Sequence, residues 1–290
     1  MEVFIRTKRY RGPVQAVVLD WAGTGIDHGC FGPVQPIVEA FARHGVELDL
    51  REARGPMGLA KKDHVRAVLN MPSVKQKWQD AHGQSPCHAH LEPHFETTVE
   101  AIYKLAEDCM LQAVSDYAIP IEGAVETLNR FRQMGLKIGS STGYTAEMMA
   151  VVIKEAARHG YVVDSVLTAD AVGGQGRPFP FMMYQNAINL GVYPMEAVVK
   201  IGDTPVDIAE GLNAGAWTIG VTHTSSHLGL SEEEAKTLPA AELAKRALEA
   251  RHLLEKAGAH FVVSHLKDCP EIIRRINSQL ANGQTPLPVE

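Results

Sequence analysis

The sequence predicts an α/β protein in which a doubly wound parallel sheet carries an inserted helical domain after its first strand. Short, valine-rich runs alternate with segments of helical periodicity, which is the pattern of successive βαβ units. The first two strands, however, end at Asp20 and Thr142, which are 122 residues apart. A βαβ unit needs only about 30 residues. We therefore expect the excess chain to form a small domain of its own.

The first predicted strand covers residues 14–20 and ends at a carboxylate followed by a glycine-containing turn. Similar apolar runs cover residues 136–142, 162–168, 197–203, 218–222 and 260–264. The helical segments between them cover residues 124–134, 146–159, 181–190 and 207–214, and a later amphipathic helix is expected over 240–257. This order is typical of a Rossmann-like sheet with helices on both faces.

The inserted segment is mostly helical, with predicted helices over residues 34–43, 62–69, 74–82 and 91–111. We expect a helical cap domain over residues 31–116 and an α/β core domain over residues 1–30 and 117–290.

The composition excludes several classes of protein. Of the 290 residues, 45% are hydrophobic and 21% charged, which excludes disorder, collagen and a coiled coil as descriptions of the whole chain. The formal charge of −6 gives no general electrostatic case for binding nucleic acid. No apolar run approaches the ~20 residues of a membrane span, and the start of the chain lacks the apolar stretch of a secretory signal. The four cysteines are far apart, which favours a reduced, cytoplasmic protein.

Polar residues follow the predicted strands at the edge where ligands bind in such sheets. They are Asp20, Thr142 and Asp203, with Asp207 one helical turn later and Arg177 on an intervening loop. Carboxylates meeting at one edge repel one another unless a cation lies between them, and oxygen ligands suit Mg²⁺. A threonine hydroxyl and an arginine add a cradle for phosphate. Each aspartate alone is explained as a helix or turn cap, but the set favours phosphoryl transfer.

The segments Asp20-x-Ala-Gly-Thr24, Thr142, Arg177-Pro-x-Pro180 and Gly202-Asp203-x-x-x-Asp207 resemble the haloacid dehalogenase superfamily over residues 14–222. The resemblance implies that Asp20 is a nucleophile that forms an aspartyl-phosphate. It implies that Thr142, Arg177, Gly23 and Thr24 bind the phosphoryl group. It also implies a Mg²⁺ ion at Asp20, Ala22 and Asp203, with Asp207 supporting this site.

The sequence departs from most phosphatases of that superfamily at Ala22. Those enzymes carry an aspartate two residues after the nucleophile, and it protonates the leaving group. Alanine has no proton to give. Either the chain is catalytically inactive, or its leaving group needs no acid.

The predicted cap favours the second alternative. Its segment Gly55-Pro-Met-Gly-Leu-Ala-Lys61-Lys-Asp-His64, with Gly29-Cys30-Phe31 and Gly139-Ser-Ser-Thr-Gly-Tyr144, resembles the phosphonatase family. That resemblance implies a Schiff base between Lys61 and the aldehyde of phosphonoacetaldehyde, whose C–P bond is cleaved to acetaldehyde and phosphate. It implies that His64, Met57, Cys30 and Tyr144 surround this lysine or join cap to core, and that the protein is a homodimer through its caps.

The chemistry of C–P cleavage explains why lysine would replace an acid. Attack at phosphorus expels a carbanion, but an iminium two carbons away accepts its electrons and yields a neutral enamine. Lys61 must be neutral to form the imine, and at an ordinary pKa of about 10.4 only ~0.04% is neutral at pH 7. We expect burial, and positive charge at Lys62 and Arg66, to lower the pKa of Lys61, whereas Asp63 would raise it.

Several points stay open in the sequence. His64 lies on the same helical face as Lys61 and is either a proton relay or a packing residue. Cys30 suits packing better than reactivity. Gly25, where the family pattern has threonine or valine, could loosen the loop. The spacing of residues 87–94 matches no standard zinc site.

Two other functions compete with C–P cleavage. An ordinary phosphomonoesterase of the superfamily is disfavoured by Ala22. A catalytically silent binding module is disfavoured by the intact residues Asp20, Thr142, Arg177 and Asp203.

Overall fold

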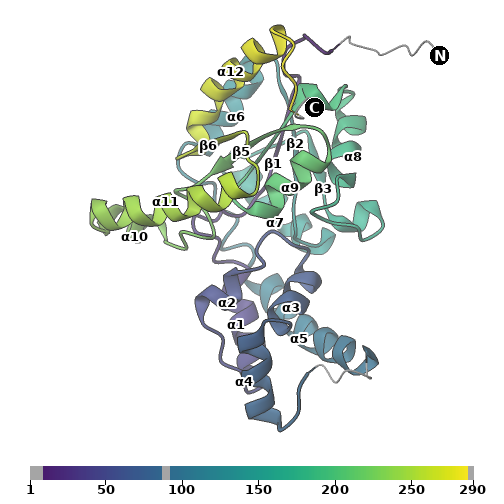
Figure 1. Cartoon of the computed structure of the whole chain (residues 1–290), viewed down its shortest axis with the longest axis vertical. Helices are drawn as coiled ribbons and strands as arrows, with labels where there is room; N and C mark the ends of the chain where they lie inside the picture. The colour runs from purple at the N-terminus through teal and green to yellow at the C-terminus, as the bar shows by residue number, and fades with distance from the viewer. Residues whose placement is uncertain (1–8, 87–91, 287–290) are drawn as a thin grey trace, which may run out of the picture.

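A parallel sheet of six strands forms the centre of the larger domain (Figure 1), in a computed structural model that describes residues 9–86 and 92–286. The strand order is β3-β2-β1-β4-β5-β6. The strands are β1 (Ala16–Leu19), β2 (Lys137–Ser141), β3 (Ser165–Leu167), β4 (Val198–Gly202), β5 (Trp217–Val221) and β6 (Phe261–Val263). This order confirms the predicted doubly wound sheet.

The central strand β1 pairs in parallel with β2 and with β4, so that Ala16 lies opposite both Lys137 and Val198. Its side chains alternate between two apolar layers. Val17 and Leu19 pack in the larger hydrophobic cluster, and Ala16 and Val18 pack in the smaller one. Burial on both faces explains why the strand is apolar without alternation.

Helices cover both faces of the sheet. The predicted core helices are present as α6 (Ala124–Gln133), α7 (Ala146–Arg158), α8 (Phe181–Leu190), α9 (Pro205–Asn213) and α11 (Ala240–Lys256). Two further helices were not predicted, α10 (Glu232–Thr237) and α12 (Cys269–Ala281). In α12 the residues Ile273, Ile276 and Leu280 are buried at helical spacing, so the sequence did contain a signal for it.

The inserted helices lie beyond the carboxyl edge of the sheet, in the lower part of Figure 1. They are α1 (Val34–Arg43), α2 (Leu50–Arg54), α3 (Lys61–Leu69), α4 (Pro72–His82) and α5 (Glu92–Ala113). Buried side chains from α1, α3 and α5 form their shared interior. Helix α2 was not predicted from the sequence. It has five residues and begins at an Asp49–Glu52 capping box. Residues 87–91 of the disfavoured zinc motif lie outside the described residues.

Two segments join the cap to the core, and they are hydrogen-bonded to each other. The Asp27 N–H donates to the Ile119 carbonyl at 3.2 Å, and the Ile121 N–H donates to the Gly25 carbonyl at 3.0 Å. We call residues 20–33 and 114–123 the hinge. The domain boundaries 30/31 and 116/117 stay predictions.

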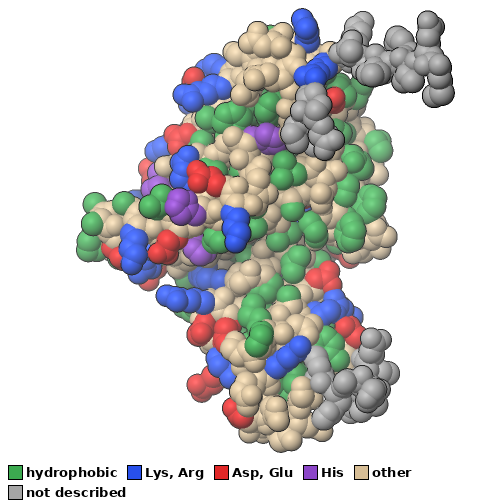
Figure 2. All heavy atoms as spheres, in the orientation of Figure 1, with side chains coloured by type: hydrophobic (Ala, Val, Ile, Leu, Met, Phe, Trp, Pro, Cys, Tyr) green, Lys and Arg blue, Asp and Glu red, His purple; other side chains and the backbone are tan. Residues whose placement is uncertain are grey.

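Acidic and basic side chains are interspersed over both domains on the face shown in Figure 2. Exposed apolar side chains also gather along α8, where Ile188 is 70% exposed and Tyr184 39% exposed. No helix among residues 9–86 and 92–286 is long and apolar enough to cross a membrane.

Candidate active site

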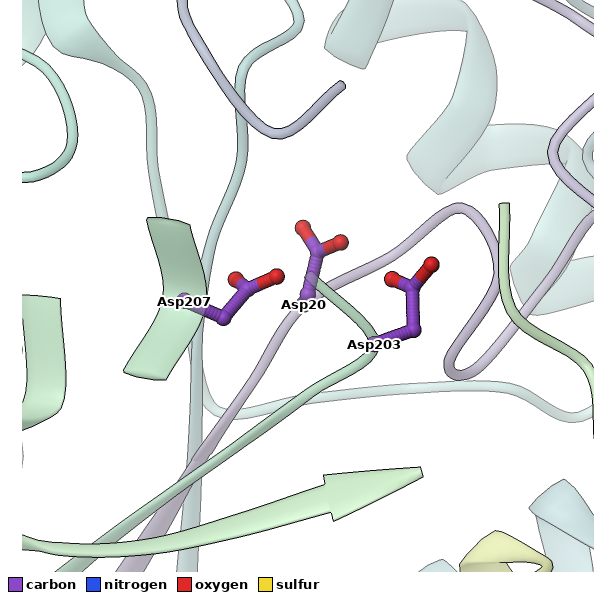
Figure 3. Close-up of side chains that lie close together, drawn as sticks. All are labelled: Asp20, Asp203 and Asp207. Atoms are coloured by element: carbon purple, nitrogen blue, oxygen red, sulfur yellow. The ribbon is translucent and has the colours of Figure 1, made fainter. Parts of the chain in front are cut away.

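Three aspartates lie together at the carboxyl edge of the sheet, with Asp20 between Asp203 and Asp207 in Figure 3. Asp20 follows β1, Asp203 follows β4, and Asp207 lies in the first turn of α9. One carboxylate oxygen from each lies within 4.8 Å of those of the other two. Because β1 and β4 are adjacent parallel strands, their ends bring these side chains to one place.

Two buried cations lie beside these carboxylates. Arg177 Nη1 is 3.1 Å from Asp20 Oδ1 and also contacts Asp207. Lys200, on β4, has its Nζ 3.1 Å from Asp207 Oδ1 and 2.8 Å from Glu210 Oε2. Burial would raise the pKa of Asp207, but Arg177 and Lys200 outweigh it and keep that pKa below its usual value. Asp207 is thus already neutralised by protein groups.

Asp203 has no such cationic partner among the described residues. Its oxygens accept hydrogen bonds from Thr24 Oγ1 at 3.3 Å and from the Ser226 N–H at 2.8 Å. Burial raises the pKa of Asp203 well above its usual value, and repulsion from Asp20 and Asp207 raises it further. The pKa of Asp20 is also raised, mainly by burial.

The charges of this buried cluster do not balance. When all its groups are ionised, four carboxylates and two cations give a net charge of −2. The carboxylates are Asp20, Asp203, Asp207 and Glu210, and the cations are Arg177 and Lys200. Buried charge is stable only when it is compensated. A divalent cation beside Asp20 and Asp203 would supply the missing charge, and hard oxygen ligands suit Mg²⁺. The donor set therefore fits the predicted metal.

A small pocket lies between the cap and the core. Its lining residues come from both domains: Asp20, Ala22, Cys30, Met57, Gly58, Lys61, Thr142, Gly143, Tyr144 and Arg177. It leaves about 10 Å³ for the centre of a water molecule, which is room for about one water. The pocket as it stands is thus too small for a molecule larger than water.

Lys61 is the cap residue that brings an amine to this pocket. It is the first residue of α3, it is 6% exposed, and its Nζ lies 4.9 Å from the centre of the Tyr144 ring. Burial lowers the pKa of Lys61, and the charge of Arg177 lowers it further. The amino end of a helix also disfavours positive charge.

The side chains that were expected to lower the pKa of Lys61 form ion pairs with other residues. Lys62 forms an ion pair with Glu100, and Arg66 pairs with Asp63 and Glu96 at the surface of the cap. The expectation that Lys62 and Arg66 depress the pKa of Lys61 is therefore wrong. Burial and a core arginine do so.

His64 is fully buried one turn after Lys61, but it does not line the pocket. Its Nε2 lies 2.7 Å from the Ala53 carbonyl, which can only accept, so Nε2 carries the proton. Nδ1 has no partner among the described residues. Burial and the charge of Lys61 lower the pKa of His64 to about 3. The imidazole is therefore neutral near pH 7.

Cys30 and Met57 line the pocket and also pack together in an apolar cluster with Val34 and Ala53. Burial raises the pKa of the Cys30 thiol well above its usual value, so the thiol stays protonated. This environment agrees with the interpretation of Cys30 as a packing residue.

Thr142 and Tyr144 belong to the loop after β2. The Thr142 hydroxyl accepts the Tyr144 N–H at 3.1 Å. Between them, Gly143 leaves room for the cap, because a Cβ there would lie 2.3 Å from the Leu59 carbonyl oxygen.

Gly23 and Thr24 face Asp203, and neither lines the pocket. Gly23 has a φ of +82°, and a Cβ there would lie 2.6 Å from Asp203 Oδ2. Ala22 lines the pocket but offers a metal only backbone atoms.

Gly25 lies against the hydroxyl of the buried Tyr161. A Cβ at this position would lie 2.0 Å from the hydroxyl oxygen of Tyr161, so the tyrosine fills the space that a larger residue would take. Tyr161 is 1% exposed and packs edge-on against Trp21 at 5.2 Å between ring centres.

Comparisons with known proteins agree with this geometry. The family model described as haloacid dehalogenase-like hydrolase matches residues 14–215. The chain is also 51% identical over 286 residues to phosphonoacetaldehyde hydrolase from Syntrophobacter fumaroxidans, covering 99% of this chain and 100% of the relative. The chain belongs to the phosphonoacetaldehyde hydrolase family of haloacid dehalogenase-like hydrolases.

Other relatives support this membership. A phosphonoacetaldehyde hydrolase from Bacillus thuringiensis (strain Al Hakam) is 44% identical over 266 residues, which cover 92% of this chain and 97% of the relative. The crystal structure of a phosphonoacetaldehyde hydrolase-like protein from Oleispira antarctica matches with a TM-score of 0.91 at 33% identity, covering 98% of this chain and 100% of that one. This member of the family is a hydrolase with the fold that its sequence predicts.

The site of this hydrolase contains charged residues that the sequence analysis missed. Lys200 interrupts the apolar strand Val-Val-Lys-Ile-Gly, and a charge inside a buried strand is a signal that could have identified it. Glu210 follows Asp207 by three residues on the same helix face. Ser141 links both, because it accepts from Lys200 at 2.7 Å and donates to Glu210 at 2.8 Å.

Proposed function

We propose that this enzyme hydrolyses the C–P bond of phosphonoacetaldehyde to give acetaldehyde and phosphate. The observation that carries the proposal is that Lys61 and Asp20, one from the cap and one from the core, line the same pocket. The names of the relatives supply the substrate.

Lys61 acts first in the proposed reaction. Its neutral amine adds to the aldehyde carbon, and the resulting carbinolamine takes up one proton and loses water to leave a protonated imine. The lowered pKa of Lys61 increases the fraction of amine that is able to attack. The closed cap excludes bulk water, which would reverse this step.

Asp20 then attacks phosphorus. The C–P bond breaks, its electron pair moves into the iminium to give an enamine, and the phosphoryl group is transferred to the Asp20 carboxylate. Water hydrolyses the aspartyl-phosphate to phosphate. The enamine takes up a proton and is hydrolysed to acetaldehyde and free Lys61. No step protonates the leaving atom as it departs, which is consistent with alanine at position 22.

Thr142 and Arg177 line the pocket and would bind the phosphonate oxygens. The side chains of Asp20 and Asp203, with backbone atoms of Ala22, would hold a Mg²⁺ ion. When bound, this ion neutralises negative charge where a carboxylate must approach an anionic phosphonate. Asp207 acts on this site by orienting Arg177.

Nδ1 is the free acceptor atom of the neutral His64 ring, because Nε2 is bound to the Ala53 carbonyl. A pKa of about 3 makes Nδ1 a weak base, so it can hold a proton only transiently near neutral pH. We propose that Nδ1 relays a proton in this transient way during imine formation. The packing role of His64 predicts instead that a His64→Gln variant that keeps the Ala53 contact forms the imine at the normal rate.

Borohydride reduction followed by mass spectrometry tests the mechanism. The wild type incubated with phosphonoacetaldehyde should yield an ethyl group on Lys61, because cleavage precedes reduction. Asp20→Ala should yield a phosphonoethyl group on Lys61 and release no phosphate. Lys61→Arg should yield no adduct, because a guanidinium does not form the imine.

Lys62→Arg is the matched control, because Lys62 is the adjacent lysine at the surface. It should be labelled like the wild type. Phosphate release by Lys61→Arg at the wild-type rate would refute the imine mechanism. Phosphate release from simple phosphomonoesters without any adduct would identify a phosphomonoesterase.

Metal dependence is tested without turnover by thermal unfolding. Added Mg²⁺ should raise the melting temperature of the wild type, by the equivalent of about 2.7 kcal/mol at a hundred times its Kd. Asp203→Asn should lose this gain. It should also stabilise the metal-free protein, because it removes one of the repelling carboxylates. An equal Mg²⁺ gain in both proteins would place the metal elsewhere.

We also propose a homodimer through the cap domains, to be tested by size-exclusion chromatography with light scattering.

We place the enzyme in the cytoplasm, where the thiols of Cys30, Cys109 and Cys269 would stay reduced.

A further inference from the structure

Arg54, the last residue of α2, connects the cap to two other parts of the molecule. Its Nη1 donates to the Gly29 carbonyl in the hinge and to the Ser226 carbonyl in the core, the latter at 3.0 Å. Its guanidinium lies over the ring of Phe31, 4.8 Å from the ring centre. One cap side chain thus contacts both the hinge and the core.

The core residue that Arg54 contacts also contacts Asp203. The Ser226 N–H donates to Asp203 Oδ2 at 2.8 Å, while the Ser226 carbonyl accepts from Arg54. Two hydrogen bonds of the Ser226 backbone therefore connect Arg54 in the cap to the carboxylate of Asp203. The Ser226 side chain also hydrogen-bonds to Asp203, and Thr24 Oγ1 donates to this carboxylate at 3.3 Å.

The segment around Ser226 is shaped to admit the guanidinium. Gly229 has a φ of +62°, and a Cβ there would lie 3.0 Å from Arg54 Cζ. Thr224 fixes the other end of the segment, since its carbonyl accepts the Gly29 N–H at 2.9 Å and its hydroxyl donates to the Gly23 carbonyl at 2.7 Å.

We infer that Arg54 is a positioning residue that orients Asp203 through Ser226 when the cap is closed. Opening of the cap withdraws Arg54 from the Ser226 carbonyl and leaves the Asp203 contact unsupported. The orientation of Asp203 in the metal site therefore depends on whether the cap is closed. This inference rests on the proposed function, because it takes Asp203 as a metal ligand.

Arginine suits this role better than lysine. Its Nη1 donates to two carbonyls from a rigid planar group, and the flat face of that group stacks on the Phe31 ring. A lysine at position 54 would keep the positive charge but would form fewer hydrogen bonds with a fixed direction. The two variants Arg54→Met and Arg54→Lys therefore separate the length and charge of the side chain from its hydrogen-bond geometry.

The experiment measures the binding of Mn²⁺, a paramagnetic substitute for Mg²⁺, by electron paramagnetic resonance in the absence of substrate. Arg54→Met should bind Mn²⁺ about tenfold more weakly than the wild type, and Arg54→Lys about threefold more weakly, because a charge-assisted hydrogen bond is lost or weakened. Arg51→Met is the matched control, an exposed arginine on the same helix, and should bind Mn²⁺ like the wild type. Hydrogen exchange at the Ser226 amide should be faster in Arg54→Met than in the control.

A purely structural role would lower the melting temperature of Arg54→Met and leave Mn²⁺ affinity, measured well below melting, unchanged. Mn²⁺ affinity within twofold of the wild type in either folded Arg54 variant would overturn the inference. Arg54→Lys keeps the test decisive if Arg54→Met does not fold. Failure of the wild type to form a borohydride adduct would refute the proposed function, and the Mn²⁺ comparison would still decide the role of Arg54.

Discussion

The Nζ of Lys61 lies 4.9 Å from the centre of the Tyr144 ring, so an aromatic side chain of the core covers the amine that the cap provides. Two effects of this ring on the Lys61 pKa oppose each other. The π-face stabilises the ammonium and raises the pKa. The ring also excludes water, and burial is the largest influence on this pKa, which it lowers.

We expect burial to dominate, so removal of the ring should raise the Lys61 pKa. Tyr144→Ala should shift the pH profile of borohydride trapping toward higher pH and slow trapping at pH 7 about tenfold, which corresponds to a rise of about one pKa unit. Tyr144→Phe keeps the ring and should retain the wild-type profile. A shift toward lower pH in Tyr144→Ala would show that the cation–π contact dominates.

Placing a carboxylate two residues after Asp20 should not help this enzyme. Ala22→Asp would add a negative charge to a cluster that is already at −2 and would increase the repulsion that raises the pKa of Asp203. Turnover of phosphonoacetaldehyde should fall at least severalfold, whereas Ala22→Asn, which adds similar volume without charge, should be less harmful. A gain in turnover by Ala22→Asp would mean that C–P cleavage does need an acid.

The meeting of the aspartates at one edge of the sheet could be predicted because it depends on strand ends. Asp20 and Asp203 follow apolar runs that the sequence marks clearly, and adjacent parallel strands bring such ends together whatever the details of packing. The position of Lys61 in the cap followed from the motif around it. The structure then shows what periodicity alone does not contain, namely that Lys61 is buried against Tyr144.

The surroundings of the edge could not be predicted in the same way. Arg54 meets Ser226 only because the cap folds back on the core, and 172 residues separate the two in sequence. Burial was predicted correctly as a cause of the lowered Lys61 pKa, but the source of the positive charge was not, for a related reason. Neighbours in sequence, such as Lys62, project from a helix in other directions, whereas Arg177 approaches from the core.

The contact between Gly25 and Tyr161 predicts strong coupling between these positions. Gly25→Thr should destabilise the protein by about 2 kcal/mol, because its Cβ would collide with the Tyr161 hydroxyl in a packed interior. In a Tyr161→Ala background the same substitution should cost less than about 0.5 kcal/mol, because the space is then open. Urea denaturation of the four proteins gives the coupling energy. Additive effects would show that the loop relaxes without help from residue 161.

Asp27, a buried hinge residue, should make stability depend on pH. Burial raises the pKa of Asp27 to about 6, although its carboxylate accepts the N–H groups of Phe31 and Gly32. The folded state therefore keeps this proton at pH values where the unfolded chain, with a pKa near 3.8, has released it. The stability that Asp27 contributes is complete below about pH 3.8 and is lost as the pH rises toward and through about 6.

Between pH 4.5 and 7.5 this loss amounts to about 2 kcal/mol. The Asp27→Asn variant has no carboxyl group to titrate at this position. Its loss of stability between the two pH values should therefore be smaller than that of the wild type by about 2 kcal/mol. Denaturation of both proteins at the two pH values measures the difference, because their other titrating groups are shared. Parallel pH profiles would mean that the folded Asp27 has an ordinary pKa.

The pairing of β1 with β2 and β4 also sets the order in which the protein must assemble on the ribosome. β1 leaves the ribosome first, but its partner β2 begins only at Lys137, after the whole cap has been synthesised. Until then the strand Ala16–Leu19 exposes two apolar faces and two unpaired edges, which are features that promote aggregation. The cap helices α1 and α3 pack mainly against α5, which is also made before β2, so the cap can fold while β1 waits. The strand that leads to Asp20 is thus the earliest strand of the sheet to be made and depends on a later strand for its first partner.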